Sequence, residues 1–98
     1  MQALNYPMKK FALIEAQKFV LRFLLDERCF SEHGHQVTEE TVLKHVSREF
    51  NDRDKKIVKR ALSKLVSQGL VGTKKKHYGV HLWINHERLE EVKQILLP

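Results

Sequence analysis

A row of basic side chains recurs at helical spacing in the second half of the chain. Arg53, Lys56, Arg60 and Lys64 follow one another at intervals of three, four and four residues. In a helix that turns by about 100° per residue, this spacing places all four cations on one side. Guanidinium and ammonium groups arranged in this way bind phosphates, and arginine can also pair with the edge of a guanine. The residue types therefore predict recognition of a polyanion.

The other side of the same segment is apolar. Five residues share that side: Val58, Ala61, Leu62, Leu65 and Val66. An apolar stripe opposite a cationic one indicates an amphipathic helix with one face on a core. We predict this helix over residues 52–68, with Asn51-Asp52 available to cap its start and Gly69 to end it.

The charge of the chain is concentrated in one window. The net charge is +6, yet residues 53–76 hold nine Lys or Arg against one acid, so the rest of the chain is net acidic. A local excess of this kind attracts anionic partners, with nucleic acid the first candidate and an acidic membrane surface the second. No apolar run approaches the roughly 20 residues of a membrane span, and no signal-peptide pattern opens the chain. We therefore expect no membrane partner and a cytoplasmic, nucleoid-associated protein.

Apolar periodicity and turn residues predict the remaining elements of a single domain over residues 1–98. Pro7 suits a helix start, Gly34 a loop over 31–36, and Thr38 and Asn85 suit helix N-caps. Val80, Leu82 and Ile84 alternate with His81 and Trp83, as in a half-buried strand. The predicted elements are helix 8–28, helix 38–50, helix 52–68, hairpin 70–84 with a basic tip, and helix 86–97. The expected class is mainly α with a small β-hairpin (α+β).

The first predicted helix carries two apolar stripes rather than one. The stripe of Ala12, Ala16, Phe19, Val20 and Phe23 faces a core, and a second stripe lies on the other side. A surface helix needs only one such stripe, so the second requires another partner. We predict a homodimer interface at Phe11, Ile14, Leu21, Leu25, Leu89, Val92 and Leu96. The alternative is that the two sets of residues pack on each other within one chain.

The order of three helices, a hairpin and a last helix resembles the winged helix-turn-helix family of DNA-binding domains. The resemblance rests on residues 38–50, 52–69 and 70–84, and it covers most of the chain. The run Leu65-Val66-Ser67-Gln68-Gly69-Leu70-Val71 is especially typical of the family's turn from recognition helix to wing. The chain looks most like compact prokaryotic or archaeal transcription regulators. The loop histidines His33 and His35 depart from the family pattern.

The resemblance implies a recognition helix over residues 52–68 and a wing tip over residues 74–78, which the charge pattern also selects. Arg53 is the best candidate for a base contact, and the lysines are better suited to phosphates. The predicted contacts to double-stranded DNA are Arg53, Lys56, Lys59, Arg60, Ser63, Lys64, Ser67, Lys74, Lys75, Lys76, His77 and Tyr78. RNA is the lesser option, because paired exposed aromatic residues that would stack bases are missing.

Other functions have weaker signals. A protein-interaction module could use the same basic face for an acidic partner. A nuclease would need clustered carboxylates, and Asp52 and Asp54 lie on different sides of one turn, so we expect no enzyme. Cys29, His33 and His35, or His77 and His81, lack the spacing of a closed zinc site, so we expect no metal. A lone cysteine forms no internal disulfide and fits a small buried residue better than a redox switch. We expect no cofactor and no small-molecule ligand.

Overall fold

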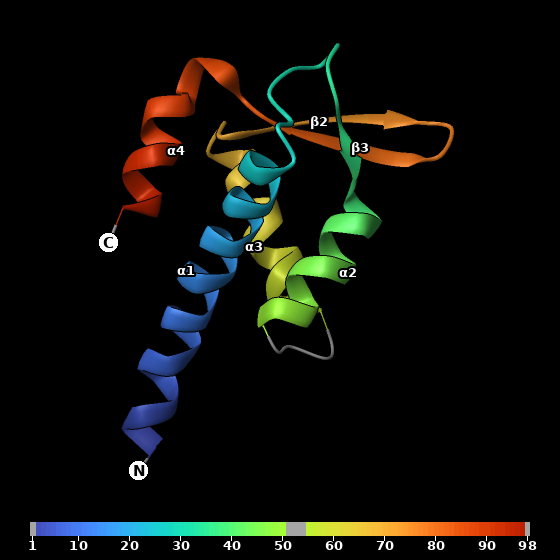
Figure 1. The fold of residues 1–98 in the computed structure, drawn as a ribbon. Helices are drawn as coiled ribbons and strands as arrows, with labels where there is room; N and C mark the ends of the chain where they lie inside the picture. Colours follow the sequence, from blue (N-terminus) through green and yellow to red (C-terminus); the bar gives the residue numbers. More distant parts are fainter. Residues whose placement is uncertain (1, 51–54, 98) are drawn as a thin grey trace.

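The computed structural model describes the backbone of residues 2–50 and 55–97, and the side chains of residues 12–50 and 55–97. Its elements, in chain order, are α1 (Gln2–Asp26), β1 (Val37–Thr38), α2 (Glu39–Phe50), α3 (Lys56–Ser67), β2 (Val71–Lys76), β3 (Gly79–Ile84), the short 3-10 helix η1 (His86–Arg88) and α4 (Leu89–Leu96). Figure 1 shows helices followed by an antiparallel hairpin and a C-terminal helix. The predicted α+β class is confirmed.

Helix α1 differs from the prediction at both ends. It begins before Pro7 rather than at it, because a proline near the start of a helix removes one hydrogen bond without ending it. It ends at Asp26, two residues early, since Arg28 takes a left-handed conformation with φ 58°. The amide of Cys29 donates to the carbonyl of Leu24, and that of Arg28 to Leu25, which is a Schellman end.

Helix α3 begins at Lys56 rather than at residue 52, because Lys55 takes a left-handed conformation with φ 64°. The predicted caps at Thr38, Gly69 and Asn85 agree with the local hydrogen bonds. The Thr38 hydroxyl accepts from the amide of Thr41 at 3.2 Å and caps α2. Gly69, with φ 77°, ends α3 in a second Schellman motif, in which the amide of Leu70 donates to the carbonyl of Leu65. The Asn85 side chain accepts from the amide of Glu87 and caps η1. The predicted last helix is therefore divided into η1 and α4.

A third strand was not predicted. The two residues of β1 pair with β3, opposite Leu82 and His81, so the antiparallel sheet has the order β1-β3-β2. A two-residue strand has no periodicity of its own and forms only because β3 offers a free edge. The amide of Ile84 also donates to the carbonyl of Cys29 at 2.8 Å, which joins the loop after α1 to the same strand.

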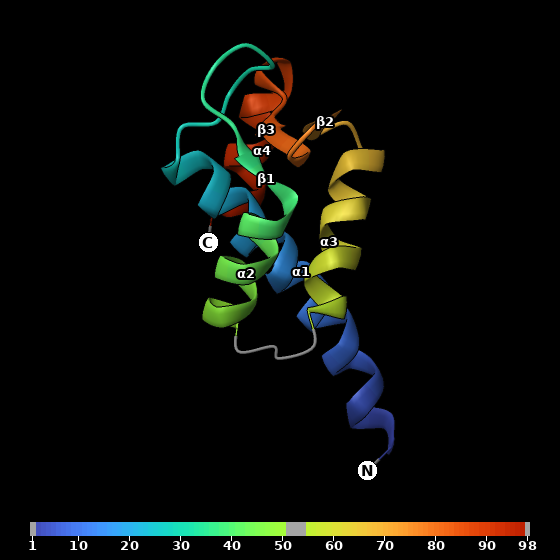
Figure 2. The same ribbon diagram turned by 90° about the vertical axis from the view of Figure 1, so that its right-hand side faces the viewer.

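Helix α1 is the centre of the packing, since it contacts α2, α3, α4 and β3. Figures 1 and 2 show it running through the domain, with its first half extending beyond the other elements. Leu21 and Val92, which we predicted at a dimer interface, are both 0% exposed. They belong to the core of one chain, because α4 folds back onto α1. Among the described helices, none combines the length and hydropathy of a bilayer-spanning segment.

Trp83 and Gly72 lie in contact on the face of the hairpin that points away from α3. The two residues are paired in the sheet, and the indole rests directly on the glycine. A Cβ at residue 72 would lie 2.4 Å from the indole ring, so no larger side chain fits unless the ring moves. Trp83 is half-buried and packs against the hydrophobic core.

Candidate nucleic-acid interface

Helix α3 separates its residue types as the sequence predicted. Val58, Ala61, Leu62 and Leu65 are buried. The exposed side consists of Lys56, Lys59, Arg60, Ser63, Lys64 and Ser67. In Figure 2 the helix lies at one edge of the molecule, so this side is turned away from α1 and α2. Arg53, the predicted base contact, and the start of the predicted helix lie outside the described residues.

Three cations of this side form no salt bridge with any described residue. Within residues 12–50 and 55–97, no salt bridge engages Lys59, Arg60 or Lys64. Lys56, Lys59, Arg60 and Ser63 together line a surface hollow of about 370 Å³. The hydroxyl of Ser67 donates to the carbonyl of Lys64 at 2.8 Å, so it is already used within the helix. Ser63 is thus the better placed of the two serines for an outside partner.

The cations in the first turn of α3 oppose its helix dipole, whereas Lys64 in the last turn suits it. Helices α2 and α4 carry acids in their first turns, whereas the first turn of α3 has none. Lys55, just before this helix, has a left-handed φ of 64° and makes no capping hydrogen bond through its side chain. Cations at the positive end of a helix are unfavourable by a few tenths to about 1 kcal/mol each. An anion bound near this end would remove that repulsion.

The three lysines of the hairpin do not share one face. Side chains alternate along a strand, and Thr73 lines a groove against α3 together with Val80 and Leu82. Lys75 pairs with Val80 and therefore lies on the α3 side of the sheet. Lys74 and Lys76 lie on the opposite side. The sequence run of three lysines is thus divided between two surfaces.

The loop over residues 31–36 covers that opposite side. The ammonium of Lys74 lies 3.8 Å from a carboxylate oxygen of Glu32, and Lys76 donates to the side-chain carbonyl of Gln36 at 3.1 Å. Gln36 in turn donates to the carbonyls of Glu32 and Ser31. Part of the charge of Lys74 is therefore neutralised within the chain, while Lys75 has no such partner among the described residues.

The tip of the hairpin is a two-residue turn of His77 and Tyr78. Tyr78 is 88% exposed, the largest value among the exposed large apolar and aromatic side chains that the structure describes. The ring therefore does not pack within the hairpin. An aromatic ring held at the end of a short turn is available to a partner that covers the tip.

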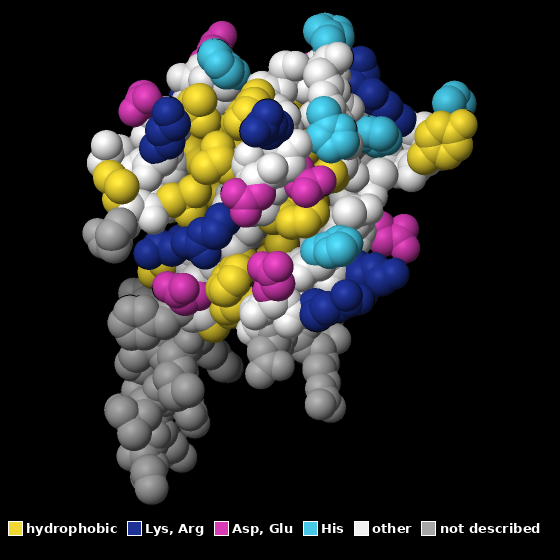
Figure 3. Space-filling view, in the orientation of Figure 1, with side chains coloured by type: hydrophobic (Ala, Val, Ile, Leu, Met, Phe, Trp, Pro, Cys, Tyr) yellow, Lys and Arg dark blue, Asp and Glu magenta, His cyan; other side chains and the backbone are white. Residues whose placement is uncertain are grey.

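Four of the six histidines lie in the loop over residues 31–36 or in the hairpin: His33, His35, His77 and His81. His33 lies 3.7 Å from Glu32, and His35 lies 3.9 Å from Glu27. Figure 3 shows histidine side chains concentrated at the upper right of this face, beside basic ones, whereas acidic and basic groups mix elsewhere on it. Among the described residues, no group of three or more His, Cys, Asp or Glu is placed to hold a metal ion.

Cys29 is fully buried at the end of α1. Burial, and to a lesser degree the charge of Glu27, raises the pKa of its thiol from 9.0 to about 11. A thiol that stays protonated is a poor nucleophile, so the position agrees with the structural role predicted for it.

The buried thiol predicts a loss of stability at high pH. The unfolded chain loses this proton near pH 9, while the folded chain keeps it until about pH 11. The contribution is therefore present below pH 9 and declines as the pH rises toward 11. The free energy of unfolding of the natural chain should fall relative to Cys29→Ala by about 2–3 kcal/mol over this range. Urea unfolding of both proteins measures the difference, and a difference that stays constant with pH contradicts the prediction.

Sequence reasoning missed a groove between α3 and the sheet. Its lining includes Glu39 from the first turn of α2, together with residues of α3, β2 and β3. The sequence feature that could have indicated the groove is a pair of small β-branched residues, Val66 and Val80, at the margins of their apolar faces. Both are half-buried in the structure. Only the three-dimensional arrangement brings Glu39 to them, because no sequence pattern relates α2 to the hairpin.

Comparisons with protein-family models, with curated proteins and with solved structures find no match to this chain.

Proposed function

We propose that the protein is a winged helix-turn-helix domain that binds double-stranded DNA and regulates transcription. The observation that carries the proposal is the exposed side of α3, where Lys59, Arg60 and Lys64 form no salt bridge among the described residues. The acid-free first turn of the same helix supports it, since both features are unfavourable for the isolated chain. A bound polyanion would pair with the exposed cations and remove the repulsion in the first turn of α3.

The dimensions of α3 suit a DNA major groove. Its 12 residues span about 18 Å, and the groove is about 12 Å wide. With one end of α3 in the groove, Lys59, Arg60 and Lys64 contact the phosphates on either side, and Ser63 faces the base edges. The hairpin is the wing, which brings Lys75 and Tyr78 to the neighbouring backbone or minor groove. Lys74 contributes less, because Glu32 already neutralises part of its charge.

Fluorescence anisotropy with a labelled random-sequence duplex tests the proposal. Binding should be tight at low salt and weaken steeply as salt is added, since each neutralised phosphate releases counterions. Selection of bound sequences from a random duplex pool then tests specificity. Absence of binding even at low salt would instead favour the alternative, a protein-interaction module that uses the basic face for an acidic partner.

We also propose that two copies associate through the outer sides of α1 and α4. Among the described residues, three apolar side chains are exposed there: Ile14 at 45%, Ile95 at 36% and Leu97, just after α4, at 57%. The side chain of Phe11, also predicted at this interface, lies outside the described residues. Leu25, Leu89 and Leu96 are partly buried against the core of their own chain, so they contribute only to the edge of this surface. Light scattering at micromolar concentration should give the mass of a dimer, and Ile14→Glu should shift it to a monomer. A monomer for the natural chain contradicts the proposal.

A further inference from the structure

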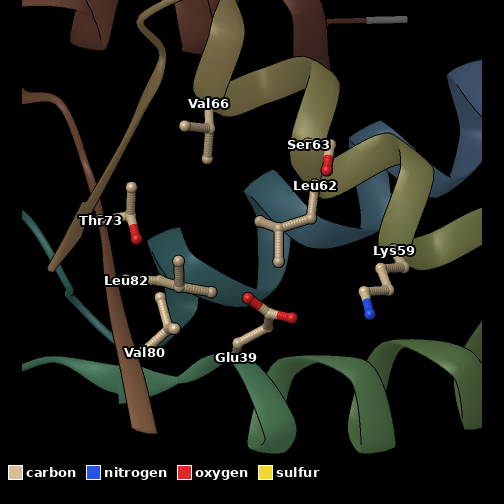
Figure 4. A pocket seen from close by; sticks show the side chains of 8 residues that line it. All are labelled: Glu39, Lys59, Leu62, Ser63, Val66, Thr73, Val80 and Leu82. Atoms are coloured by element: carbon tan, nitrogen blue, oxygen red, sulfur yellow. The ribbon is translucent and has the colours of Figure 1, made fainter. Parts of the chain in front are cut away.

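A groove of about 310 Å³ lies between α3 and the hairpin. Figure 4 shows its lining: Leu62 and Val66 from α3 on one side, Thr73, Val80 and Leu82 from the sheet on the other. Leu62 and Leu82 are nearly fully buried and form the floor, while Val66 and Val80 are half-buried walls. Because the wall residues are short, no side chain among the described residues fills the space.

Two opposite charges face this groove from different helices. In Figure 4 the carboxylate of Glu39, on α2, and the ammonium of Lys59, on α3, lie at the same end of the groove and point toward it. Within the described residues they form no salt bridge with each other or with any other side chain. Glu39 is also half-buried. The groove thus offers an anion, a cation and an aliphatic surface, with the hydroxyl of Ser63 beside Lys59.

We infer that this groove binds a free α-amino acid with a branched aliphatic side chain. The ammonium of the ligand pairs with Glu39, its carboxylate pairs with Lys59, and its side chain lies between Val66, Val80 and Leu82. A fatty acid could pair only with Lys59 and would leave Glu39 unpaired, and an alkylamine could pair only with Glu39 and would leave Lys59 unpaired, so only a zwitterion satisfies both charges. The volume lies at the lower end of the range for small-molecule sites.

The ligand would also regulate the proposed DNA-binding side, an effect that rests on the proposed function. Lys59 and Ser63 line this groove and also the hollow on the outer side of α3 that they share with Lys56 and Arg60. A carboxylate held by Lys59 removes one cation from the phosphate-binding side. Occupancy of the groove therefore weakens DNA binding.

The first experiment uses no DNA. L-Leucine is titrated into the full chain labelled with nitrogen-15, and amide shifts are followed by NMR. We expect saturable shifts at millimolar ligand centred on Leu62, Thr73 and Val80. Glu39→Gln should weaken leucine binding about tenfold, whereas Glu40→Gln, the matched change at the exposed neighbour, should not. 4-Methylpentanoate and 3-methylbutylamine, which each lack one charge, should bind at least about tenfold more weakly than leucine.

Absence of saturable amide shifts, or equal effects of Glu39→Gln and Glu40→Gln on leucine binding, would contradict the proposed site.

The second experiment repeats the DNA titration with and without saturating L-leucine. A decrease in DNA affinity of about threefold to tenfold is expected, since one phosphate contact is lost. An unchanged DNA affinity would contradict the regulatory effect but would not contradict the leucine site. Failure of the chain to bind DNA overturns the proposed function, while the leucine titration still decides the site.

Discussion

Replacing Arg60 and Lys64 together by alanine is expected to weaken binding to duplex DNA by about a hundredfold at moderate salt, about tenfold for each charge-assisted phosphate contact. Both side chains are exposed on α3, and neither has a salt-bridge partner among the described residues, so their loss removes external contacts rather than internal ones. The fold should be unchanged, because the apolar side of the helix is untouched.

The salt dependence gives a second measure of the same contacts. If each subunit neutralises about six phosphates, log affinity should fall with log salt at a slope of about −5. The double variant should reduce the magnitude of that slope by about 2, one unit for each lost phosphate contact. Anisotropy titrations over a series of salt concentrations measure affinity and slope together.

The control is a variant that loses the same net charge elsewhere. Lys44 on α2 and Lys93 on α4 are both exposed, and within the described part of the chain Lys93 pairs with Glu90 alone. Lys44→Ala plus Lys93→Ala should leave the slope unchanged. Equal losses for the two double variants would mean that the chain binds DNA through its overall charge and that α3 has no special position.

The second large effect concerns stability. Leu21→Ala should lower the free energy of unfolding by about 2–5 kcal/mol, because it leaves a cavity where α1 meets its neighbours. Its side chain is 0% exposed. Ile14→Ala, on the same helix at 45% exposure, should cost less than about 1 kcal/mol at concentrations where the chain is a monomer. Urea unfolding monitored by circular dichroism measures both.

Protein concentration separates the core interpretation from the interface that the sequence suggested. A core residue should destabilise the chain equally at all concentrations, whereas an interface residue should act through association. Unfolding of Leu21→Ala that matches the natural chain, together with weaker self-association, would restore Leu21 to the interface.

The features that local chemistry determines were predictable. Thr38, Gly69 and Asn85 indicate helix ends in the sequence, because the hydrogen bonds that cap each helix involve residues only a few positions away. The two-sided character of α3 was equally readable, since both its core contacts and its cations follow one period. The sequence was wrong about Leu21 because a second apolar stripe indicates a further neighbour without identifying it. Here that neighbour is α4 of the same chain.

The parts that depend on distant segments were not predictable. The run of lysines at 74–76 looked like one cluster, yet strand alternation and the contact of Lys74 with Glu32 divide it between two surfaces. The strand at Val37–Thr38 exists only through pairing with β3. The groove between α3 and the hairpin needs Glu39, which lies 20 positions before Lys59 in the chain. Each of these features arises where separate elements meet.

Because the indole of Trp83 rests on Gly72, the tryptophan fluorescence of the protein reports on the contact between these two residues. The chain contains a single tryptophan, so its emission spectrum reads one place only: the contact between paired strands at the base of the hairpin. Any partner that bends or twists those strands will shift the wavelength without an added dye, and a partner that seats elsewhere will leave it unchanged.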